Sequence, residues 1–439
     1  MLLSSVRTIS IDDMTANYIG HMCYAASKLW NVCNFECRNW KSLGLAYFPD
    51  WYYQKKHHKN DIWYKNLPSQ TAQEVCKVLH SAWSSYFSLV KYGSSINPKP
   101  PRFKTDKIPV TYMQNGMRHN DDTIRLAIPK QLKEHMAQKY GHHADYLYMK
   151  HNSFIHDDHI KQLHVYPPVY DGKTYRCKVI VVYEIADRPA LPDNGHYLSI
   201  DMGVHNFLSC MDSLGCNTFI VGREYLSICR HFDKEIARVQ SAWYTQQSTH
   251  GIQHPVQSKH IQKLYDKKHD HIHNYLHQMT AYIVSYCVKH HINTVIIGDI
   301  TGIRNNKKYG HVVNQQFHGL PYAKIYMMLK YKLKKYGITL VKQNEAYSSQ
   351  CSPMAQHVSK KYATPEKRVH RGLYSDGRYI WNADSVGAYN IMRLYLHSIK
   401  RDDIIKHDLT PNGLSSPVVI KVVPYKKVSV KSTDSCRTA

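Results

Sequence analysis

The chain lacks the features of a secreted or membrane-embedded protein. Its 11 cysteines are scattered and include no Cys-x-x-Cys pair, which argues against a two-pair zinc site and favours reduced, buried thiols. No apolar run reaches the length of a transmembrane helix, and residues 1–7 (MLLSSVR) are too short and polar for a signal peptide. We therefore expect a cytoplasmic or nucleoid-associated protein with no membrane partner.

Acidic residues are also scarce. Asp and Glu number 33 against 58 Lys and Arg, which gives a formal net charge of +25. Such an excess indicates a polyanionic partner, and nucleic acid is the obvious one, with a generically basic soluble protein as the alternative. The 35 tyrosines add rings on which unpaired bases can stack. The length of 439 residues predicts two to four domains.

The N-terminal part is predicted to be mainly helical. Apolar residues recur at helical spacing over 14–40 and again over 70–90. Between these segments lies the basic, aromatic run 51–59 (WYYQKKHHK). We expect this run to be a surface loop that is either simply solvated or faces nucleic acid through Lys55 and Lys56.

Prolines then break the helical pattern at residues 97–104 (NPKPPRFK), which we interpret as an extended basic linker that carries Arg102 and Lys104. Beyond this linker, short alternating or apolar segments predict strands and a small β-barrel. These segments are 123–128, 159–166 and 177–185. The proline-containing stretch 187–195 (DRPALPDNG) marks a domain boundary.

From residue 196 the pattern is that of an α/β domain in which acidic residues follow the strands. The first strand ends on Asp201, a later one on Asp299, a short third one leads to Glu345, and Asp384 opens an amphipathic helix. This order is expected for a ribonuclease-H-like fold. The predicted strands are 197–200, 207–211, 218–221, 294–298 and 339–341, and the predicted helices span about 226–290, 322–336 and the region up to about 397.

Converging carboxylates of this kind suit a pair of Mg²⁺ ions, because Mg²⁺ prefers a few carboxylates together with water and phosphate oxygens. In phosphodiester hydrolysis one ion activates water and the other stabilises the leaving oxygen. Each acid alone is a weak indication, because an aspartate at a strand end is most often a turn or cap residue. The joint order of all four is the stronger signal.

Together these motifs resemble those of the TnpB family, transposon-encoded nucleases with a RuvC site that are related to compact type V CRISPR effectors. Residues 198–206 (LSIDMGVHN) resemble the first RuvC motif, 295–306 (VIIGDITGIRNN) the second and 382–391 (NADSVGAYNI) the third. Further matching segments are 63–73, 100–104, 314–318, 331–338 and 345–352. The resemblance extends over most of the chain, from about residue 15 to residue 397.

The resemblance implies an Mg²⁺-dependent, RNA-guided DNA endonuclease. A guide RNA derived from the transposon end would pair with double-stranded target DNA beside a short adjacent motif, and one RuvC site with two Mg²⁺ ions would cut it. One monomer per RNA is expected, in the cytoplasm or nucleoid of a prokaryote or phage-infected cell.

The same resemblance implies a division of the chain into domains. The expected domains are 1–14 as the first part of a wedge β-barrel, 15–104 as a helical recognition lobe, 105–192 as the rest of the wedge, 193–349 as the RuvC-like nuclease with motifs I and II, 350–380 as a target-nucleic-acid-binding mini-domain, 381–400 as RuvC motif III and 401–439 as a basic, partly disordered tail.

The second motif departs from the family pattern, because Gly298-Asp299 stands where many relatives have a catalytic Glu. In a subset of the family with Gly-Asp, the acid comes from the Glu-x-Tyr segment, here Glu345. The resemblance therefore implies Asp201, Glu345 and Asp384 as catalytic metal ligands, with Asp299 as the alternative third acid. The structural alternatives are that Asp299 caps a turn or that Glu345 pairs with a surface lysine.

The zinc ribbon of the relatives is degenerate in this chain. Only Cys351 remains of its first cysteine pair, and 374–379 (YSDGRY) stands where the second pair falls, so we expect no zinc and a metal-free mini-domain. His277 is expected to be a packed helix histidine, with support of the site or of RNA as the alternative. The residues predicted to bind nucleic acid are Lys55, Lys56, Arg102, Lys104, Arg304, Lys360, Lys361, Arg368 and Arg371.

Two other functions remain open from the sequence. A nuclease-inactive descendant would use the guide RNA to occupy DNA and repress it. A structure-specific RuvC-like nuclease would cut without a guide, although the helical segment and the strands ahead of residue 196 disfavour this alternative.

Overall fold

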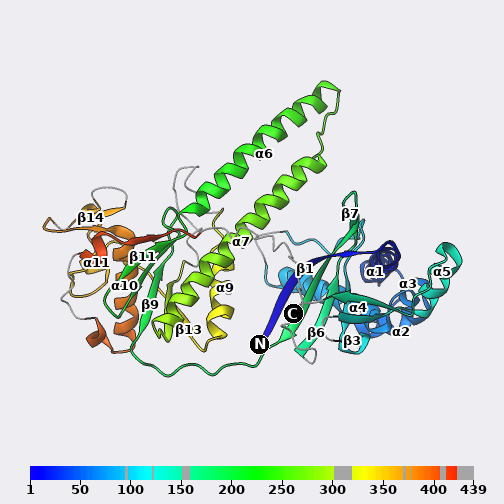
Figure 1. Cartoon of the computed structure of the whole chain (residues 1–439), viewed down its shortest axis with the longest axis horizontal. Coiled ribbons are helices and arrows are strands. Elements are labelled where there is room, and N and C mark those ends of the chain that lie inside the picture. Colours follow the sequence, from blue (N-terminus) through cyan, green and yellow to red (C-terminus); the bar gives the residue numbers. More distant parts are fainter. Residues whose placement is uncertain are drawn as a thin grey trace, which may run out of the picture. The chain divides into compact units, whose positions relative to one another are not determined.

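The computed structural model describes residues 1–93, 97–120, 123–150, 159–300, 319–368, 372–375, 377–405 and 412–422. The chain folds into two compact units, Met1–Ala186 and Asp187–Ala439, each with its own helices and sheets (Figure 1). The fold is therefore mixed α/β and multidomain, as predicted. The predicted residues Arg304 and Arg371, the segment 314–318 and the tail beyond residue 422 lie outside the described residues.

The helices of unit 1 pack around α1 (Asp13–Asn39) and α4 (Ser69–Lys91), which correspond to the two predicted helical segments. Helix α1 begins where Asp12 accepts a hydrogen bond from the backbone N–H of Thr15 at 2.7 Å, an ordinary N-cap. Apolar residues of both helices are fully buried in one core. The shorter helices are α2 (Trp51–His57), α3 (Ile62–Lys65) and α5 (Lys130–Tyr140).

The prediction of a loop at 51–59 is wrong, because α2 and a 3-10 turn occupy this run. Asp50 caps α2 by accepting from the Tyr53 N–H at 2.8 Å. Gln54 is buried and donates to the Cys33 carbonyl of α1 at 3.1 Å, and α2 packs on α4. A cap and a single buried polar side chain fix this helix, and neither produces an apolar period that a basic, aromatic run would reveal.

The strands of unit 1 form two sheets. In the larger one, β1 (Leu2–Ile11), β8 (Tyr175–Glu184), β6 (Ile160–Val165) and β2 (Val110–Met113) lie in this order, and β7 (Val169–Tyr170) also pairs with β8. The smaller sheet has the order β3 (Met117–Asn120), β4 (Thr123–Ala127) and β5 (Tyr146–Lys150). Strands were predicted where β4, β6 and β8 lie, whereas closure of the sheets into a barrel stays a prediction.

Unit 2 is built on a six-stranded mixed sheet. Its strands are, in spatial order, β13 (Thr339–Gln343), β12 (Thr294–Gly298), β9 (Tyr197–Asp201), β10 (Leu208–Asp212), β11 (Thr218–Val221) and β16 (Val418–Ile420). Strands β9, β10 and β11 form the predicted antiparallel meander. Because β12 runs parallel to both β9 and β13, the carboxyl ends of these three strands meet at one edge of the sheet.

Helices cover both faces of this sheet. Leu198 and Ile200 face the core formed with α7 (Lys259–Lys289) and α9 (Tyr322–Lys334). Tyr197, on the alternate face of the same strand, packs with α10 (Ala383–Ser398). Side chains alternate along a strand, so Asp201 lies on the α10 side.

Three further elements of unit 2 surround this arrangement. Helix α6 (Glu224–Thr249) pairs with α7 in a long hairpin that projects beyond the sheet (Figure 1). Strands β14 (Leu373–Ser375) and β15 (Ile380–Asn382) form a small antiparallel hairpin just before α10. In the described part of the chain, no helix is both long and apolar enough to cross a membrane.

Candidate active site

The first predicted acid, Asp201, is the last residue of β9 and lies against helix α10. A Cβ atom added at Gly387 would collide with the Asp201 carboxylate, so only glycine allows the helix to come this close. The contact continues one residue further on, where buried Ser199 donates through Oγ to the Ala388 carbonyl at 2.7 Å. The first and third motifs are therefore joined through close packing of β9 on α10.

The second acid, Asp384, lies in the first turn of α10. The side chain of Asn382 caps this helix by accepting from the N–H groups of Asp384 and Ser385, each at 3.1 Å. Asn206 donates through Nδ2 to Oδ2 of Asp384 at 2.6 Å, and Arg223 donates through Nε to Oδ1 of Asn206 at 2.7 Å. The carboxylate is thus oriented by a two-residue chain of hydrogen bonds.

Asn206 and Arg223 were not predicted as functional residues. Asn206 stands within the first motif, but the sequence offered no role for it. The signal for Arg223 was weaker still, because its link to Asp384 passes through another side chain across three segments of the fold.

The third acid, Glu345, follows β13 in a turn rather than ending a strand. A Cβ atom at Gly298 would collide with Oε2 of Glu345, so the glutamate occupies the space that a side chain at the end of β12 would otherwise take. The Oε2 atom is shielded from solvent. The glycine at 298 and the glutamate at 345 are therefore spatially complementary.

The three acids lie close enough for their charges to interact. Burial raises the pKa of Asp201 well above its ordinary value, and the negative charges of Asp384 and Glu345 raise it further, while Arg368 lowers it. A carboxylate with like charges beside it favours either a proton or a cation in the site. The predicted acids Asp201, Asp384 and Glu345 thus form one cluster at the carboxyl-terminal edge of the sheet.

Asp299 lies at the same edge but makes other contacts. Its N–H donates to the Gln343 carbonyl at 2.7 Å, which extends the pairing of β12 and β13 by one residue. Its carboxylate pairs with Nζ of Lys342 at 3.3 Å, with both side chains partly exposed. An ion pair of this kind contributes little stability.

The donor chemistry of the cluster fits Mg²⁺ or another hard divalent cation, since every ligand would be a carboxylate oxygen. Within the described ranges, no three His, Cys, Asp or Glu side chains are already arranged around a single metal position. A site with two ions would share these carboxylates between them, so the carboxylates would not all have to surround one position. Asp201, Glu345 and Asp384 are the residues that would hold such a cation.

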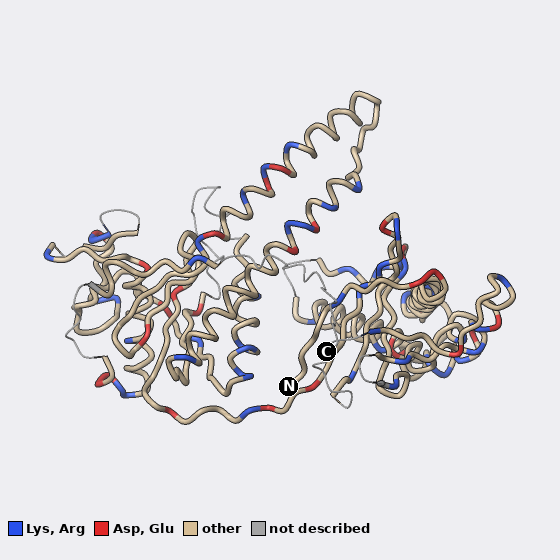
Figure 2. The backbone as a smooth tube through the Cα atoms, in the orientation of Figure 1, with Lys and Arg blue, Asp and Glu red and all other residues tan. Residues whose placement is uncertain are grey.

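The basic residues predicted to contact nucleic acid lie on both units, as Figure 2 shows for Lys and Arg in general. On α2, the Lys55 ammonium lies 4.5 Å from the ring centre of Trp51, and Lys56 is exposed. In unit 2, Lys360, Lys361 and Arg368 are exposed on the segment that precedes α10.

The predicted linker 97–104 is extended but bound along α1. Trp30 donates through Nε1 to the Arg102 carbonyl at 3.1 Å, and Asn31 and Lys104 exchange two hydrogen bonds. The Arg102 and Lys104 side chains remain exposed. The segment is therefore a fixed basic strap rather than a free linker.

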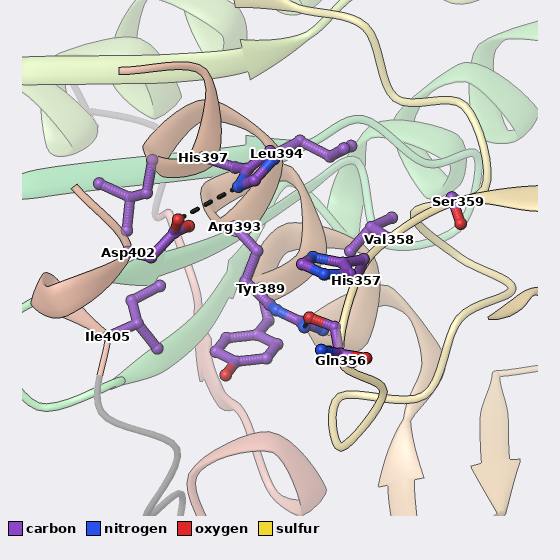
Figure 3. Close-up of a pocket in the computed structure, with 11 residues that line it drawn as sticks. Gln356, His357, Val358, Ser359, Tyr389, Arg393, Leu394, His397, Asp402 and Ile405 are labelled. Atoms are coloured by element: carbon purple, nitrogen blue, oxygen red, sulfur yellow. Dashed lines mark hydrogen bonds and ion pairs between the residues drawn. The ribbon is translucent and has the colours of Figure 1, made fainter. Parts of the chain in front are cut away.

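Residues 350–368, the first described part of the metal-free mini-domain expected at 350–380, lie beside α10. Cys351 is buried, and its thiol contacts the Ser359 carbonyl at 3.3 Å. A cavity of about 450 Å³ opens between residues 356–359 and α10 (Figure 3). On its wall His397 and Asp402 pair at 3.1 Å, and Arg393 reaches from α10 to the backbone at Gln356.

Comparisons with known proteins agree with this architecture. Residues 180–304 match the family profile OrfB_IS605, described as a probable transposase, and residues 322–391 match the profile "Cas12f1-like, TNB domain". No curated protein matches the chain.

Solved structures that align with this chain include the following three. A complex of Cas12f1 with sgRNA and target DNA aligns with a TM-score of 0.57 at 14% identity, over 87% of this chain and 83% of that chain. A CRISPR-Cas12f ternary complex gives a TM-score of 0.35 at 14% identity, over 86% and 81%. The mini RNA-guided endonuclease CRISPR-Cas_phi3 gives 0.33 at 10% identity, over 70% and 65%. The chain thus has a Cas12f1-like fold and, as its motifs predicted, resembles the TnpB family over residues 180–304, which include Asp201. Glu345 and Asp384 lie in the segment that matches the Cas12f1-like TNB profile.

Proposed function

We propose that this protein is an Mg²⁺-dependent, RNA-guided DNA endonuclease with a single RuvC-like site. The observation that carries the proposal is the cluster of Asp201, Glu345 and Asp384 at one edge of the sheet. The match to the OrfB_IS605 profile and the net charge of +25 support it, because a nuclease that holds an RNA–DNA duplex must neutralise many phosphates.

In the proposed site, Asp201, Glu345 and Asp384 would hold the metal. When bound, Mg²⁺ supplies an activated water nucleophile and neutralises charge at the scissile phosphate. Asn206 and Arg223 keep the Asp384 carboxylate in one orientation, and Gly387 lets Asp201 approach the helix that carries Asp384. Arg368 adds positive charge near Asp201 that suits an incoming phosphate.

The proposed partners are a guide RNA and double-stranded target DNA. A solved structure with the same fold is a complex with sgRNA and target DNA, which supports this choice. Unit 1 would supply the recognition lobe, residues 15–104, and most of the wedge, residues 1–14 and 105–192. The mini-domain 350–380 would contact target DNA through Lys360, Lys361 and Arg368. We propose one protein monomer per RNA.

Two measurements test the proposal. The protein, expressed with its flanking DNA, should copurify with one defined RNA and should cut matching DNA only when Mg²⁺ is present. Asp201→Ala and Asp384→Ala should each reduce cutting to the level seen without Mg²⁺ and leave RNA retention nearly unchanged, because the basic surfaces stay intact.

Glu345→Gln and Asp299→Asn form a matched pair that decides the third ligand. We expect Glu345→Gln to abolish cutting and Asp299→Asn to retain it, since Asp299 pairs with Lys342. Cutting that survives the loss of both Asp201 and Asp384 would refute the RuvC assignment. Guide-dependent binding without any cutting in Mg²⁺ would favour the repressor, and cutting without RNA would favour the unguided nuclease.

A further inference from the structure

Glu345 differs from the other two acids in how its backbone is supported. Asp201 ends a strand and Asp384 begins a helix, whereas Glu345 opens a turn that runs through residues 345–350. Tyr347, within this turn, has a φ of 65°, a left-handed conformation that a non-glycine residue keeps only when its surroundings impose it. A metal ligand on such a turn needs support from another element.

Asn390 of α10 provides contacts of this kind. Its side chain is fully buried, and Nδ2 donates to the carbonyls of Ser348 at 2.7 Å and Cys351 at 2.9 Å. The Ser348 N–H in turn donates to the Glu345 carbonyl at 3.0 Å. Two hydrogen bonds therefore lead from α10 to the backbone of Glu345.

The orientation of the Asn390 amide is itself fixed. Arg393, one turn further along α10, donates through Nη1 to Oδ1 of Asn390 at 3.2 Å, which leaves Nδ2 to face the turn. Arg393 also donates to the carbonyls of Pro353, Ala355 and Gln356. The amide thus has a partner for its oxygen and two for its nitrogen, so it holds the turn in a single arrangement.

We propose that Asn390 is a positioning residue for Glu345, so that α10 presents one metal-binding carboxylate directly, through Asp384, and fixes a second one indirectly. The inference rests on the proposed function, since it takes Glu345 to be a metal ligand. Asn390 itself does not touch the metal or the substrate. It acts by keeping the Glu345 carboxylate in the space beside Gly298.

A double-mutant cycle on metal affinity tests this role without relying on cleavage. Mn²⁺ binding to the full-length protein would be titrated by electron paramagnetic resonance for wild type, Asn390→Ala, Glu345→Gln and the double variant. We expect Asn390→Ala to weaken Mn²⁺ binding about tenfold, the lower end for the loss of an outer partner of a metal site. In the Glu345→Gln background, the same change should alter affinity by less than about twofold, because the residue it acts through is already lost.

Asn206→Ala is the matched control. It removes an asparagine that contacts the site through Asp384, so it should weaken Mn²⁺ binding by the same factor with or without Glu345. Asn390→Ser keeps a hydrogen-bond donor and should lose less affinity than Asn390→Ala. Far-UV circular dichroism at the titration temperature checks that each variant is folded, which matters because Asn390 is fully buried.

The outcomes distinguish failure of the Asn390 positioning role from failure of the metal site itself. If Asn390→Ala leaves affinity unchanged, or weakens it equally in both backgrounds, the positioning role is overturned while the metal site stands. If Glu345→Gln alone leaves Mn²⁺ affinity unchanged, Glu345 is not a ligand, and the site assignment and the positioning role both fail.

Discussion

At the scale of single residues, two glycines belong to the candidate site as much as the acids do. Gly387 gives Asp201 room against α10, and Gly298 gives Glu345 room at the end of β12. Neither glycine has a positive φ, so the reason for each is the space beside it rather than backbone freedom. Substitutions at these positions test the packing of the carboxylates directly.

Gly387→Ala should damage the site although alanine is the better helix former by about 1 kcal/mol. The added methyl would overlap the Asp201 carboxylate, so we expect weaker Mn²⁺ binding and a loss of about 1–3 kcal/mol in unfolding free energy. Denaturant unfolding and Mn²⁺ titration measure the two effects. Gly20→Ala in α1 is the control, because its nearest neighbour is the flexible tip of Lys107 at 3.3 Å. Equal or greater stability of Gly387→Ala would contradict the close packing.

The carboxylate should also be movable from position 345 to position 298. Glu345→Ala should abolish Mg²⁺-dependent cutting, and adding Gly298→Asp should restore it to within about 10²-fold of wild type, the cost of a misplacement of about 1 Å. Gly298→Asp alone should lower activity, because two carboxylates would then compete for one space. Cleavage assays on the three variants check this; full activity of Gly298→Asp while Glu345 is intact would argue against the shared space.

The sequence pointed to the acids of the candidate site but not to the residues that contact them. Asp201, Glu345 and Asp384 were predicted because each stands in a local motif whose type and order carry information. Asn206, Arg223 and Asn390 act through hydrogen bonds to residues far away in the chain, and such contacts exist only once β9, α10 and the turn at 345–350 are packed together. These hydrogen-bond partners therefore could not be predicted from one sequence.

At the scale of elements, helical and strand patterns predicted most segments of unit 2, because strands β9 to β12 are buried on both faces and its helices are amphipathic. Helix α2 was missed because one cap and one buried glutamine define it. The basic strap at 97–104 was recognised as extended, but its hydrogen bonds to Trp30 and Asn31 of α1 could not be predicted from composition.

Because α7 packs on α9 around His277, we expect the stability of the fold to depend on pH. Burial lowers the pKa of His277 to about 4, and the charges of Lys332, His273 and Lys324 act in the same direction. The unfolded chain therefore binds this proton first as the pH falls below the ordinary histidine pKa of about 6.5, so stability is lost between about pH 6.5 and 4. We expect wild type to lose about 1–2 kcal/mol more than His277→Gln between pH 7.5 and 5.

Urea unfolding at the two pH values measures this difference. His254→Gln is the control, because His254 is exposed in the turn between α6 and α7 and its loss should leave the pH dependence unchanged. An identical pH dependence for His277→Gln and wild type would show that the helix interface tolerates the protonated ring.

At the scale of the whole molecule, the proposed function needs acidic and basic side chains to be separated. The acids of the candidate site cluster at one sheet edge of unit 2, while Lys and Arg occur along both units (Figure 2). The affinities for guide RNA and target DNA should both fall as the salt concentration rises, because Lys and Arg side chains that bind phosphates release counterions. Removing positive charge from a surface that contacts only target DNA should therefore weaken DNA binding and leave the retention of guide RNA unchanged.

The mini-domain offers this test, since its exposed residues Lys360, Lys361 and Arg368 are proposed to contact target DNA. Changing all three to Gln in an Asp201→Ala protein, which we expect to bind without cutting, should weaken target binding and flatten its log–log salt dependence by about 2–3, roughly 0.9 for each phosphate that is no longer neutralised. Retention of guide RNA should stay as in the parent protein.

The control removes equal charge from exposed positions of unit 1 by changing Lys130, Lys139 and Lys150 to Gln. Target affinity measured from about 50 to 300 mM salt distinguishes the two triple variants, and an equal loss in both would mean that total charge, rather than the mini-domain surface, governs DNA binding.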